Sequence, residues 1–502
     1  MKSIFKAVAT VTIFSVITRT LGFFFRIFMS RKLGAEGIGI FQMASSVLGI
    51  FLTLVSSGLP LITAKSVSKY ESMNRLIQRN KVVGSALVVG IVCSVFCAVL
   101  IIMLKNFFNN ILTDSRAVEI LIVLIPSILF SAIYSVFRGA LWGKNDFFNC
   151  GLTELIEQIV RFILTIVLLF GIKDVFVLTK NAAIAFNITC FISALFVVVI
   201  YFKKHNRLSF KKGEYLGLIK NSAPITFIRI SSSFVQPLTA LVVPAMLVVS
   251  GFTKAEAVAS FGVVMGMTFP LLFVPMAVIG SISMVLIPAI TSLLVKRDFR
   301  SIEENVSQSL KVSFFISMMF VPLYLSVGDI IGIVLFDNAL SGLLLQVSAI
   351  CVVPITICNL SGSILNALDL EIKSFINYCI GSALMFVSLF MLTPTIQINA
   401  VPISFFLSMS LTSALNMKTI KKKLPSLKFN LLKTSALYSA IAIPSSLLGN
   451  FISGICQHFF THFFSAVVGG SFSIVSIIIL CNICKLYSLE NLKNILKKKK
   501  KI

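Results

Sequence analysis

Long apolar runs separated by short polar connections dominate this sequence. Fourteen runs can be placed, near 9–29, 38–62, 82–104, 118–137, 150–171, 181–202, 218–249, 259–291, 309–333, 342–367, 374–393, 399–417, 434–455 and 463–484. A helix of about 20 residues rises about 30 Å, the thickness of the hydrocarbon core of a bilayer. The runs are too long and too uniformly apolar for barrel strands. With 57% hydrophobic and 12% charged residues, we expect an all-α polytopic membrane protein of about fourteen transmembrane helices.

The positive charges follow the expected sides of a membrane. The chain carries 44 Lys and Arg against 18 Asp and Glu, a formal net charge of +26. Of these cations, 33 lie at the termini and in alternate short connections, including one with Arg138 and Lys144, whereas the opposite connections hold seven. This alternation argues against a nucleic acid partner and predicts that both termini are cytoplasmic. The basic connections and the tail Lys497–Lys501 are expected to contact anionic lipid headgroups.

The other four cations fall inside predicted spans. They are Arg19 and Arg26 in the first run, Arg161 in the fifth and Arg229 in the seventh. Arg19 and Arg26 are seven residues apart, so a helix presents them on one face. Charge in hydrocarbon costs roughly 2.5 to 3.5 kcal/mol, so such a face must meet water or a counter-charge. We expect Arg19, Arg26 and Arg229 to line a substrate-binding cavity. A structural role, with Arg26 reaching the interface and Arg19 pairing with another helix, stays open.

Two glutamates share the fifth run with Arg161. Glu154, Glu157 and Arg161 follow the spacing i, i+3, i+7 and lie on one helical face, so that Glu157 and Arg161 can pair directly. One interpretation is a structural pair that makes buried charge tolerable. The other is an ion-coupling or gating set, in which Glu154 or Glu157 exchanges a proton or sodium ion, or locks a closed state by meeting Arg19 or Arg26.

The balance of charge inside the membrane indicates the class of substrate. Four arginines against two glutamates favour an anion, because guanidinium groups match phosphate oxygens bidentately. A glycine-lysine nucleotide loop is missing, so ATP hydrolysis is not expected, and an ion gradient or the membrane potential must drive transport. The ten cysteines lie mainly in apolar runs, and Cys481-x-x-Cys484 lacks a second ligand pair. We therefore expect a protein that is not an enzyme and uses no metal or cofactor.

A weak internal repeat suggests two bundles. Residues 35–41 resemble 255–261, and residues 60–63 resemble 288–291. Six spans separate the copies, so the halves share an orientation and are related by an axis along the membrane normal. The predicted division is a six-helix lobe at 1–212, a second six-helix lobe at 213–425, and two further helices with the basic tail at 426–502. Chance similarity between apolar segments stays open.

Several of these residues also form motifs of a known family. The segment Thr18-Arg19 with Leu21-Gly22-Phe23, the turn Gly34-Ala35-Glu36-Gly37, and Glu157-Gln158-x-x-Arg161 are the clearest, with Arg31 and Gly266-Met267-x-x-Pro270 as further matches. The chain resembles the polysaccharide-export and lipid-flippase branch of the multidrug/oligosaccharidyl-lipid/polysaccharide (MOP) exporter superfamily.

The resemblance implies a two-lobed flippase in the bacterial cytoplasmic membrane. Its implied substrate is an undecaprenyl-pyrophosphate-linked cell-wall precursor, lipid II or its counterpart for spore cortex peptidoglycan, moved by alternating access. Arg19 matches the first-helix motif directly. Phe25-Arg26 stands where the lipid II branch carries an Arg-Asp pair, and Glu154 stands where a neutral polar residue is expected.

Other functions stay open at this point. A drug or cation antiporter of the same fold needs acidic groups in its cavity, and only Glu154 and Glu157 qualify. An exporter of another polysaccharide unit would look the same in sequence. A membrane glycosyltransferase or ligase usually needs a sizeable external loop, and the outer connections are all short. A scaffold that binds cell-wall synthesis proteins is the last alternative.

Overall fold

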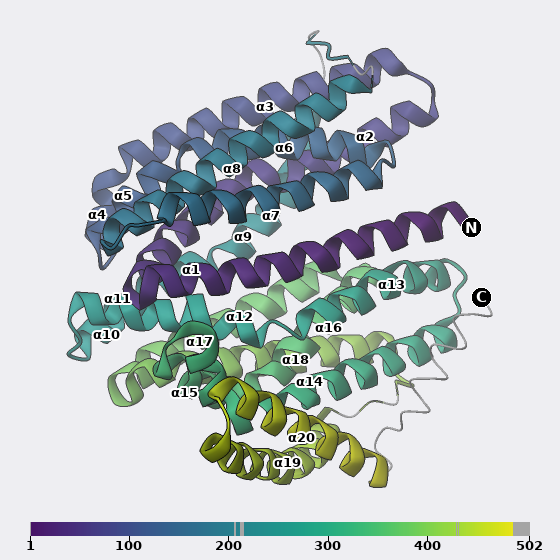
Figure 1. Cartoon of the computed structure of the whole chain (residues 1–502). Helices are drawn as coiled ribbons and strands as arrows, with labels where there is room; N and C mark the ends of the chain where they lie inside the picture. Colours follow the sequence, from purple (N-terminus) through teal and green to yellow (C-terminus); the bar gives the residue numbers. More distant parts are fainter. Residues whose placement is uncertain (1, 205–206, 211–214, 428, 430, 485–502) are drawn as a thin grey trace. The chain divides into compact units, whose positions relative to one another are not determined.

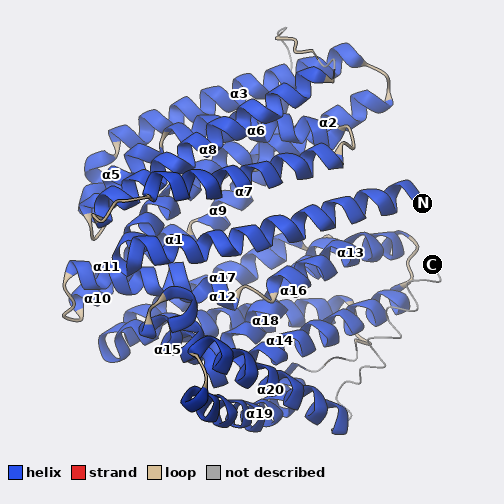
Figure 2. Ribbon diagram, viewed as in Figure 1, coloured by secondary structure: helices blue, strands red, loops and turns tan. Residues whose placement is uncertain are grey.

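The computed structural model describes residues 2–204, 207–210, 215–427, 429 and 431–484. Within these ranges all regular structure is helical (Figure 2), which confirms the all-α prediction. The chain divides into two compact units, Met1–Gly262 and Val263–Ile502.

The first unit consists of helices joined mostly by short turns (Figure 1). They are α1 (Lys2–Ser56), α2 (Gly58–Ser72), α3 (Leu76–Met103), α4 (Lys105–Ile111), α5 (Ser115–Leu124), α6 (Pro126–Gly143), α7 (Phe147–Leu169), α8 (Val175–Lys203), α9 (Tyr215–Ser233), α10 (Val235–Val249) and α11 (Lys254–Gly262). Buried side chains of α2, α3, α6, α7, α8 and α9 form an apolar cluster around Val83, Phe137 and Tyr201.

Helix α1 is broken at Gly34. This residue has φ 66° and ψ −176°, a conformation that a side chain would strain. Just after the break, Glu36 accepts a hydrogen bond from Arg116 at 2.5 Å, and Arg116 also pairs with Asp114 at 2.7 Å. The turn expected between the first two spans is therefore a kink inside one long helix, fixed by an arginine at the start of α5.

Helix α3 shows how the unit faces lipid. Its exposed residues include Val92, Phe96 and Met103, which repeat at helical spacing, whereas Gly90 and Ser94 on the other side are buried. Large apolar side chains outside and small residues at helix contacts are typical of membrane proteins. The pattern agrees with a membrane-spanning helix.

The second unit follows a similar plan. It contains the π-helical segment η1 (Val263–Thr268), α12 (Phe269–Leu272), α13 (Met276–Val295), α14 (Phe299–Phe336), α15 (Ala339–Ser348), α16 (Val352–Ala367), α17 (Glu371–Ile396), α18 (Ala400–Lys423), α19 (Leu431–Phe459) and α20 (His462–Ile483), with 3₁₀ turns at Ala349–Cys351 and Gln397–Asn399. Its core lies among α13, α14, α16, α18, α19 and α20. Helix α14 has 38 residues, and at about 1.5 Å per residue it is longer than a bilayer core is thick.

The described residues contain eleven helical stretches long and apolar enough to cross a membrane, or twelve if the bent pair α5–α6 counts as one span. Two of these stretches, Ile13–Ser72 and Glu371–Lys423, are each long enough to include two predicted spans. The count of fourteen and the cytoplasmic termini stay predictions, and the tail Lys497–Lys501 lies outside the described residues.

The boundary between the compact units falls at Gly262. Helix α9 belongs with the first unit because its backbone lies directly against α2: a Cβ added at Gly58 would lie 2.6 Å from the carbonyl oxygen of Ser222. Thr53 of α1 and Ser233 of α9 also share a hydrogen bond at 3.1 Å. The division of the sequence at 212 and 425, which follows the internal repeat, stays a prediction.

Candidate functional site

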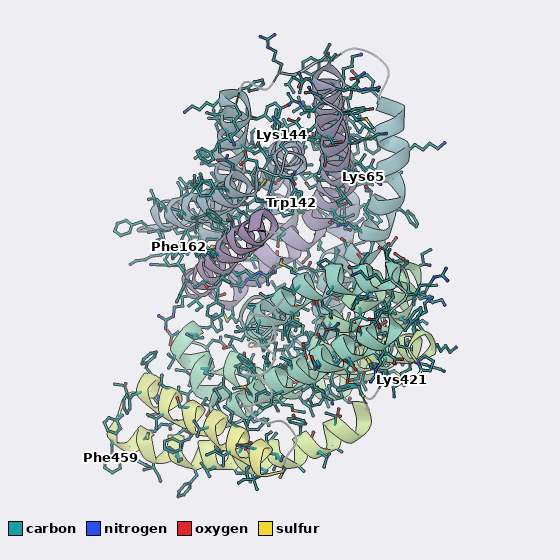
Figure 3. All side chains as sticks on the ribbon, turned by 90° about the vertical axis from the view of Figure 1, so that its right-hand side faces the viewer. Lys65, Trp142, Lys144, Phe162, Lys421 and Phe459 are labelled. Atoms are coloured by element: carbon teal, nitrogen blue, oxygen red, sulfur yellow. The ribbon has the colours of Figure 1, made fainter. Side chains whose placement is uncertain are left out.

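The first unit contains an open cavity of about 590 Å³. Six helices supply its walls, and the lining residues are Leu52, Ser56, Ser57, Pro60, Leu61, Ala64, Ser131, Tyr134, Ser135, Arg138, Gly139, Trp142, Glu157, Cys190, Ser193 and Arg229. Trp142, a lining residue near the end of α6, and Lys144, just after α6, are both labelled in Figure 3. The three charged groups in this wall are Arg138, Glu157 and Arg229.

Two glycines allow the walls to approach each other. A Cβ added at Gly58 of α2 would lie 2.1 Å from Thr226 Oγ1 of α9, and one at Gly139 of α6 would lie 2.6 Å from the carbonyl oxygen of Pro60. Real Cβ atoms do not come so close to backbone, so the contacts between α2 and its neighbours depend on glycine. These contacts hold α6 and α9, with Arg138 and Arg229, around α2.

Arg138 is the site residue that the sequence analysis missed. It was assigned to a connection, but α6 continues to Gly143 and places Arg138 in the cavity wall. Its Nη2 lies 2.9 Å from Glu154 Oε1 of α7 in an ion pair, and its Cζ lies 6.0 Å from the ring centroid of Tyr134. A signal was present: Ser131, Tyr134, Arg138 and Trp142 repeat every three or four residues, which marks one polar helical face.

The expected contact between Glu157 and Arg161 is present as an ion pair within α7. The Arg161 guanidinium also lies 5.3 Å from the ring of Phe186 on α8. Glu157 reaches the cavity, whereas Arg161 does not line it. The role of this pair, whether structural or in ion coupling, stays a prediction.

The predicted arginines divide into two groups. Arg229 lines the cavity from α9. Arg19 and Arg26 are exposed on α1, neither lines the cavity, and neither forms an ion pair with a described residue. The glutamates expected to meet them pair with Arg138 and Arg161 instead. The structure thus brings Arg229, Arg138 and Glu157 together but leaves Arg19 and Arg26 apart from them.

Unpaired polar atoms gather around the cavity. Among the described residues, the buried hydroxyls of Ser56, Ser57 and Ser193 and the Nε of Arg138 have no hydrogen-bond partner, and all four residues line it. Buried polar groups are normally satisfied, so such a cluster indicates a place for a polar ligand or water. Three hydroxyls and a guanidinium N–H can donate to the oxygens of a phosphate or a sugar.

Comparison with known proteins identifies the family. Residues 4–294 match the family described as polysaccharide biosynthesis protein. The chain belongs to this family. The match confirms the resemblance to the polysaccharide and lipid flippase branch of the MOP superfamily, and the protein is a multi-pass protein of the bacterial cytoplasmic membrane.

Relatives in Bacillus subtilis (strain 168) include two with functional names. Stage V sporulation protein B is 25% identical over 427 residues, which cover 82% of each chain. Lipid II flippase MurJ is 23% identical over 337 residues, which cover 61% of each chain. Both matches are longer than the first unit, Met1–Gly262, which contains the cavity.

Solved structures share the fold at low identity. An inward-facing multidrug resistance MATE family transporter of the MOP superfamily has a TM-score of 0.70 at 14% identity, over 82% of this chain and 99% of that one. A MOP superfamily transporter from Pyrococcus furiosus, described as having a binding pocket of reverse polarity, has a TM-score of 0.60 at 14% identity, over 85% and 97%. These likenesses show a MATE-like fold.

Proposed function

We propose that this family member is a flippase for a lipid-linked saccharide. The substrate is an undecaprenyl-pyrophosphate-linked cell-wall precursor of the lipid II type, moved from the inner to the outer leaflet by alternating access. Membership of the polysaccharide biosynthesis family supports this function, as do the names of the two Bacillus relatives. The name of one relative, stage V sporulation protein B, supports a role in sporulation, and a precursor of spore cortex peptidoglycan is the cargo that we propose for such a role.

The observation that carries the proposal is the chemistry of the cavity. Two arginines face one glutamate there, so the wall carries a net positive charge, and four unpaired polar atoms are available to a ligand. Pyrophosphate offers the oxygens and negative charge that such a wall would bind. The volume of about 590 Å³ lies within the range of small-molecule sites.

Each predicted residue has a place in this proposal. Arg138 and Arg229 bind the pyrophosphate inside the cavity. Arg19 and Arg26, exposed on α1, contact the substrate on its way in or out. Glu154, Glu157 and Arg161 form the gating or ion-coupling set on α7. Anionic lipids contact the basic connections, and cell-wall synthesis proteins receive the flipped product.

A MATE-like antiporter for drugs or cations is the second candidate. The TM-score of 0.70 to a multidrug transporter favours it, although this likeness concerns the fold alone. An organic cation needs acidic groups in the cavity, and Glu157 is the single carboxylate among the described lining residues. A cavity with two arginines therefore favours an anion over a drug cation, and an exporter of another polysaccharide unit shares the same chemistry.

Native mass spectrometry of the purified protein tests the proposal. Lipid II, undecaprenyl phosphate and an organic cation compete for wild type and for Arg19→Ala, Arg26→Ala, Arg138→Ala and Arg229→Ala. We expect selective binding of lipid II, weakened most by Arg138→Ala and Arg229→Ala. Arg300→Ala, an exposed arginine of α14, is the matched control.

Two results would contradict the proposal. Preferential binding of the organic cation would favour the antiporter. Binding of lipid II that all four substitutions leave unchanged would remove the cavity argument.

A further inference from the structure

Two ion pairs on α7 differ in their exposure. Arg138 and Glu154 come from two helices and keep 31% and 37% of their side chains exposed. Glu157 and Arg161 lie one turn apart on one helix and keep 20% and 17%. Opening a buried pair leaves charge without a partner, whereas a group that already reaches water can be solvated instead. The pair between Arg138 and Glu154 therefore opens at the lower cost in free energy, so that another anion can replace Glu154 on Arg138.

Arg138 has a second contact in the cavity wall besides Glu154. The ring of Tyr134, one turn earlier on α6, lies 6.0 Å from its Cζ and also lines the cavity. Glu154 forms an ion pair with Nη2, while the buried Nε has no hydrogen-bond partner among the described residues. A guanidinium carries five N–H donors, so Arg138 is anchored with donor capacity left over.

We propose that Glu154 is a built-in competitor for the anionic group of the substrate. In the empty protein its carboxylate occupies Arg138, and an entering phosphate replaces it. A phosphate has more oxygens and more charge than a carboxylate and suits the guanidinium fork, so it can displace Glu154. Glu154 does not itself line the cavity, so its release leaves the space free. This inference rests on the proposed function, because it assumes a phosphate-bearing substrate.

The depth of the pair fits a lipid phosphate. Arg138 lies five residues before the end of α6, and Glu154 lies seven residues after the start of α7. At 1.5 Å per residue, the pair is about 8 to 10 Å inside the end of this hairpin. Lipid headgroups occupy roughly the outer 5 to 8 Å on each side of a bilayer. A phosphate can thus reach Arg138 while its polyprenyl tail remains in the membrane.

The turn between the two helices is fixed on its own. Asp146 accepts hydrogen bonds from Lys204, the residue after α8, and from Asn149 Nδ2, the latter at 2.9 Å. Arg79 donates to Glu71 at 2.8 Å next to this turn, and Lys144 lies 4.0 Å from the same glutamate. Removal of the carboxylate of Glu154 therefore leaves the hairpin of α6 and α7 held at its end.

Binding of undecaprenyl pyrophosphate to the full chain in detergent tests the inference. We expect Glu154→Gln to bind this lipid about fivefold more tightly than wild type, which corresponds to about 1 kcal/mol. In an Arg138→Gln background the same substitution should give no gain. Glu119→Gln removes an exposed carboxylate on α5 and serves as the control for total charge. If Glu154→Gln does not fold, Glu154→Asp, whose carboxylate is one methylene shorter, should bind about twofold more tightly.

The outcomes separate the two proposals. If wild type does not bind undecaprenyl pyrophosphate, the proposed function fails and this inference fails with it. If wild type binds and Arg138→Gln weakens binding, but Glu154→Gln or Glu154→Asp gives no gain, the proposed function stands and the inference is wrong. An equal gain in Glu119→Gln, or a lower melting temperature of Glu154→Gln without any gain, would also overturn it.

Discussion

The two units stabilise their polar interiors by different means. Seven of the eight ion pairs between described residues lie in the first unit, and the eighth, Arg300 with Glu304, is exposed on α14. The second unit instead uses neutral groups. Asn377 donates to Asn416 at 3.0 Å, Asn416 donates to Ser361 at 3.1 Å, and two hydroxyl pairs, Ser317 with Thr356 and Ser326 with Ser473, join helices directly.

This difference separates function from scaffold. Charge inside a membrane is expensive, and neutral hydrogen bonds between helices contribute about 0.6 kcal/mol on average without that expense. Neutral hydrogen bonds are sufficient for a unit that only needs to hold its helices together, and the second unit uses such bonds. The proposed binding of an anion therefore depends on the arginines and glutamates of the first unit.

The largest expected effect concerns the charged wall of the first unit. The double substitution Arg138→Ala and Arg229→Ala removes both cavity arginines, and loss of two charge-assisted contacts of about 1.5 kcal/mol each should lower flipping of lipid II more than a hundredfold. Proteoliposomes with a fluorescent lipid II measure the rate. Arg300→Ala in the second unit should stay within twofold of wild type, and an equal loss there would break the comparison.

In the second unit the same logic predicts an effect on stability. Asn416→Ala leaves Asn377 and Ser361 without their bonds to it, and we expect unfolding in detergent to become easier by about 1 to 2 kcal/mol. Binding of undecaprenyl pyrophosphate should stay within twofold. A loss of binding in a folded variant would show that the neutral network serves the site as well.

Asp329 is the exception that could break the comparison. This carboxylate lies in α14 next to the irregular residue Val327, and its Oδ1 is buried without a partner among the described residues. Asp329→Leu removes an unsatisfied acceptor at similar volume, so we expect a melting temperature equal to or slightly above that of wild type. If the variant folds but transport stops, the second unit carries a functional charge.

The smallest expected effect depends on pH at the turn between α6 and α7. Burial acts to raise the pKa of Asp146, but hydrogen bonds from Lys204 and Asn149 outweigh it and hold the pKa below its ordinary value. The resulting stabilisation is present above the unfolded pKa of about 3.9 and is lost as the pH falls through the folded pKa. Asp146→Asn should therefore lower the free energy of unfolding by about 0.5 kcal/mol at pH 7, and this difference should shrink as the pH falls below the unfolded pKa of about 3.9.

Asp298→Asn offers the matching measurement in the second unit. Hydrogen bonds from Ser301 lower the pKa of Asp298, which is fully exposed at the start of α14. Melting curves across pH should show a smaller change in melting temperature, relative to wild type, for Asp298→Asn than for Asp146→Asn. The reverse order would contradict the conclusion that charged groups stabilise the first unit more than the second.

The sequence predicted contacts within a helix and missed contacts between helices. Glu157 and Arg161 are four residues apart, so a regular helix alone brings them together. Arg138 and Glu154 lie on two helices, and their contact depends on where α6 ends, which hydropathy does not define to within several residues. The helical class and the positions of the apolar runs follow from composition, whereas the cavity depends on close backbone contacts at Gly58 and Gly139.

The occupied state of Arg138 has a consequence for the living cell. Cytoplasm is rich in inorganic phosphate, nucleotides and acidic metabolites, all of which would compete for an arginine that waits in an open cavity. Under the proposed competition, each of these anions would have to displace the carboxylate that is paired with the arginine, and each would lose the same amount of binding free energy. A substrate anchored in the bilayer would displace the carboxylate more easily, because its tail keeps the phosphate at a high local concentration. Glu154 would then weaken the binding of soluble anions to Arg138 more than the binding of the lipid-linked substrate.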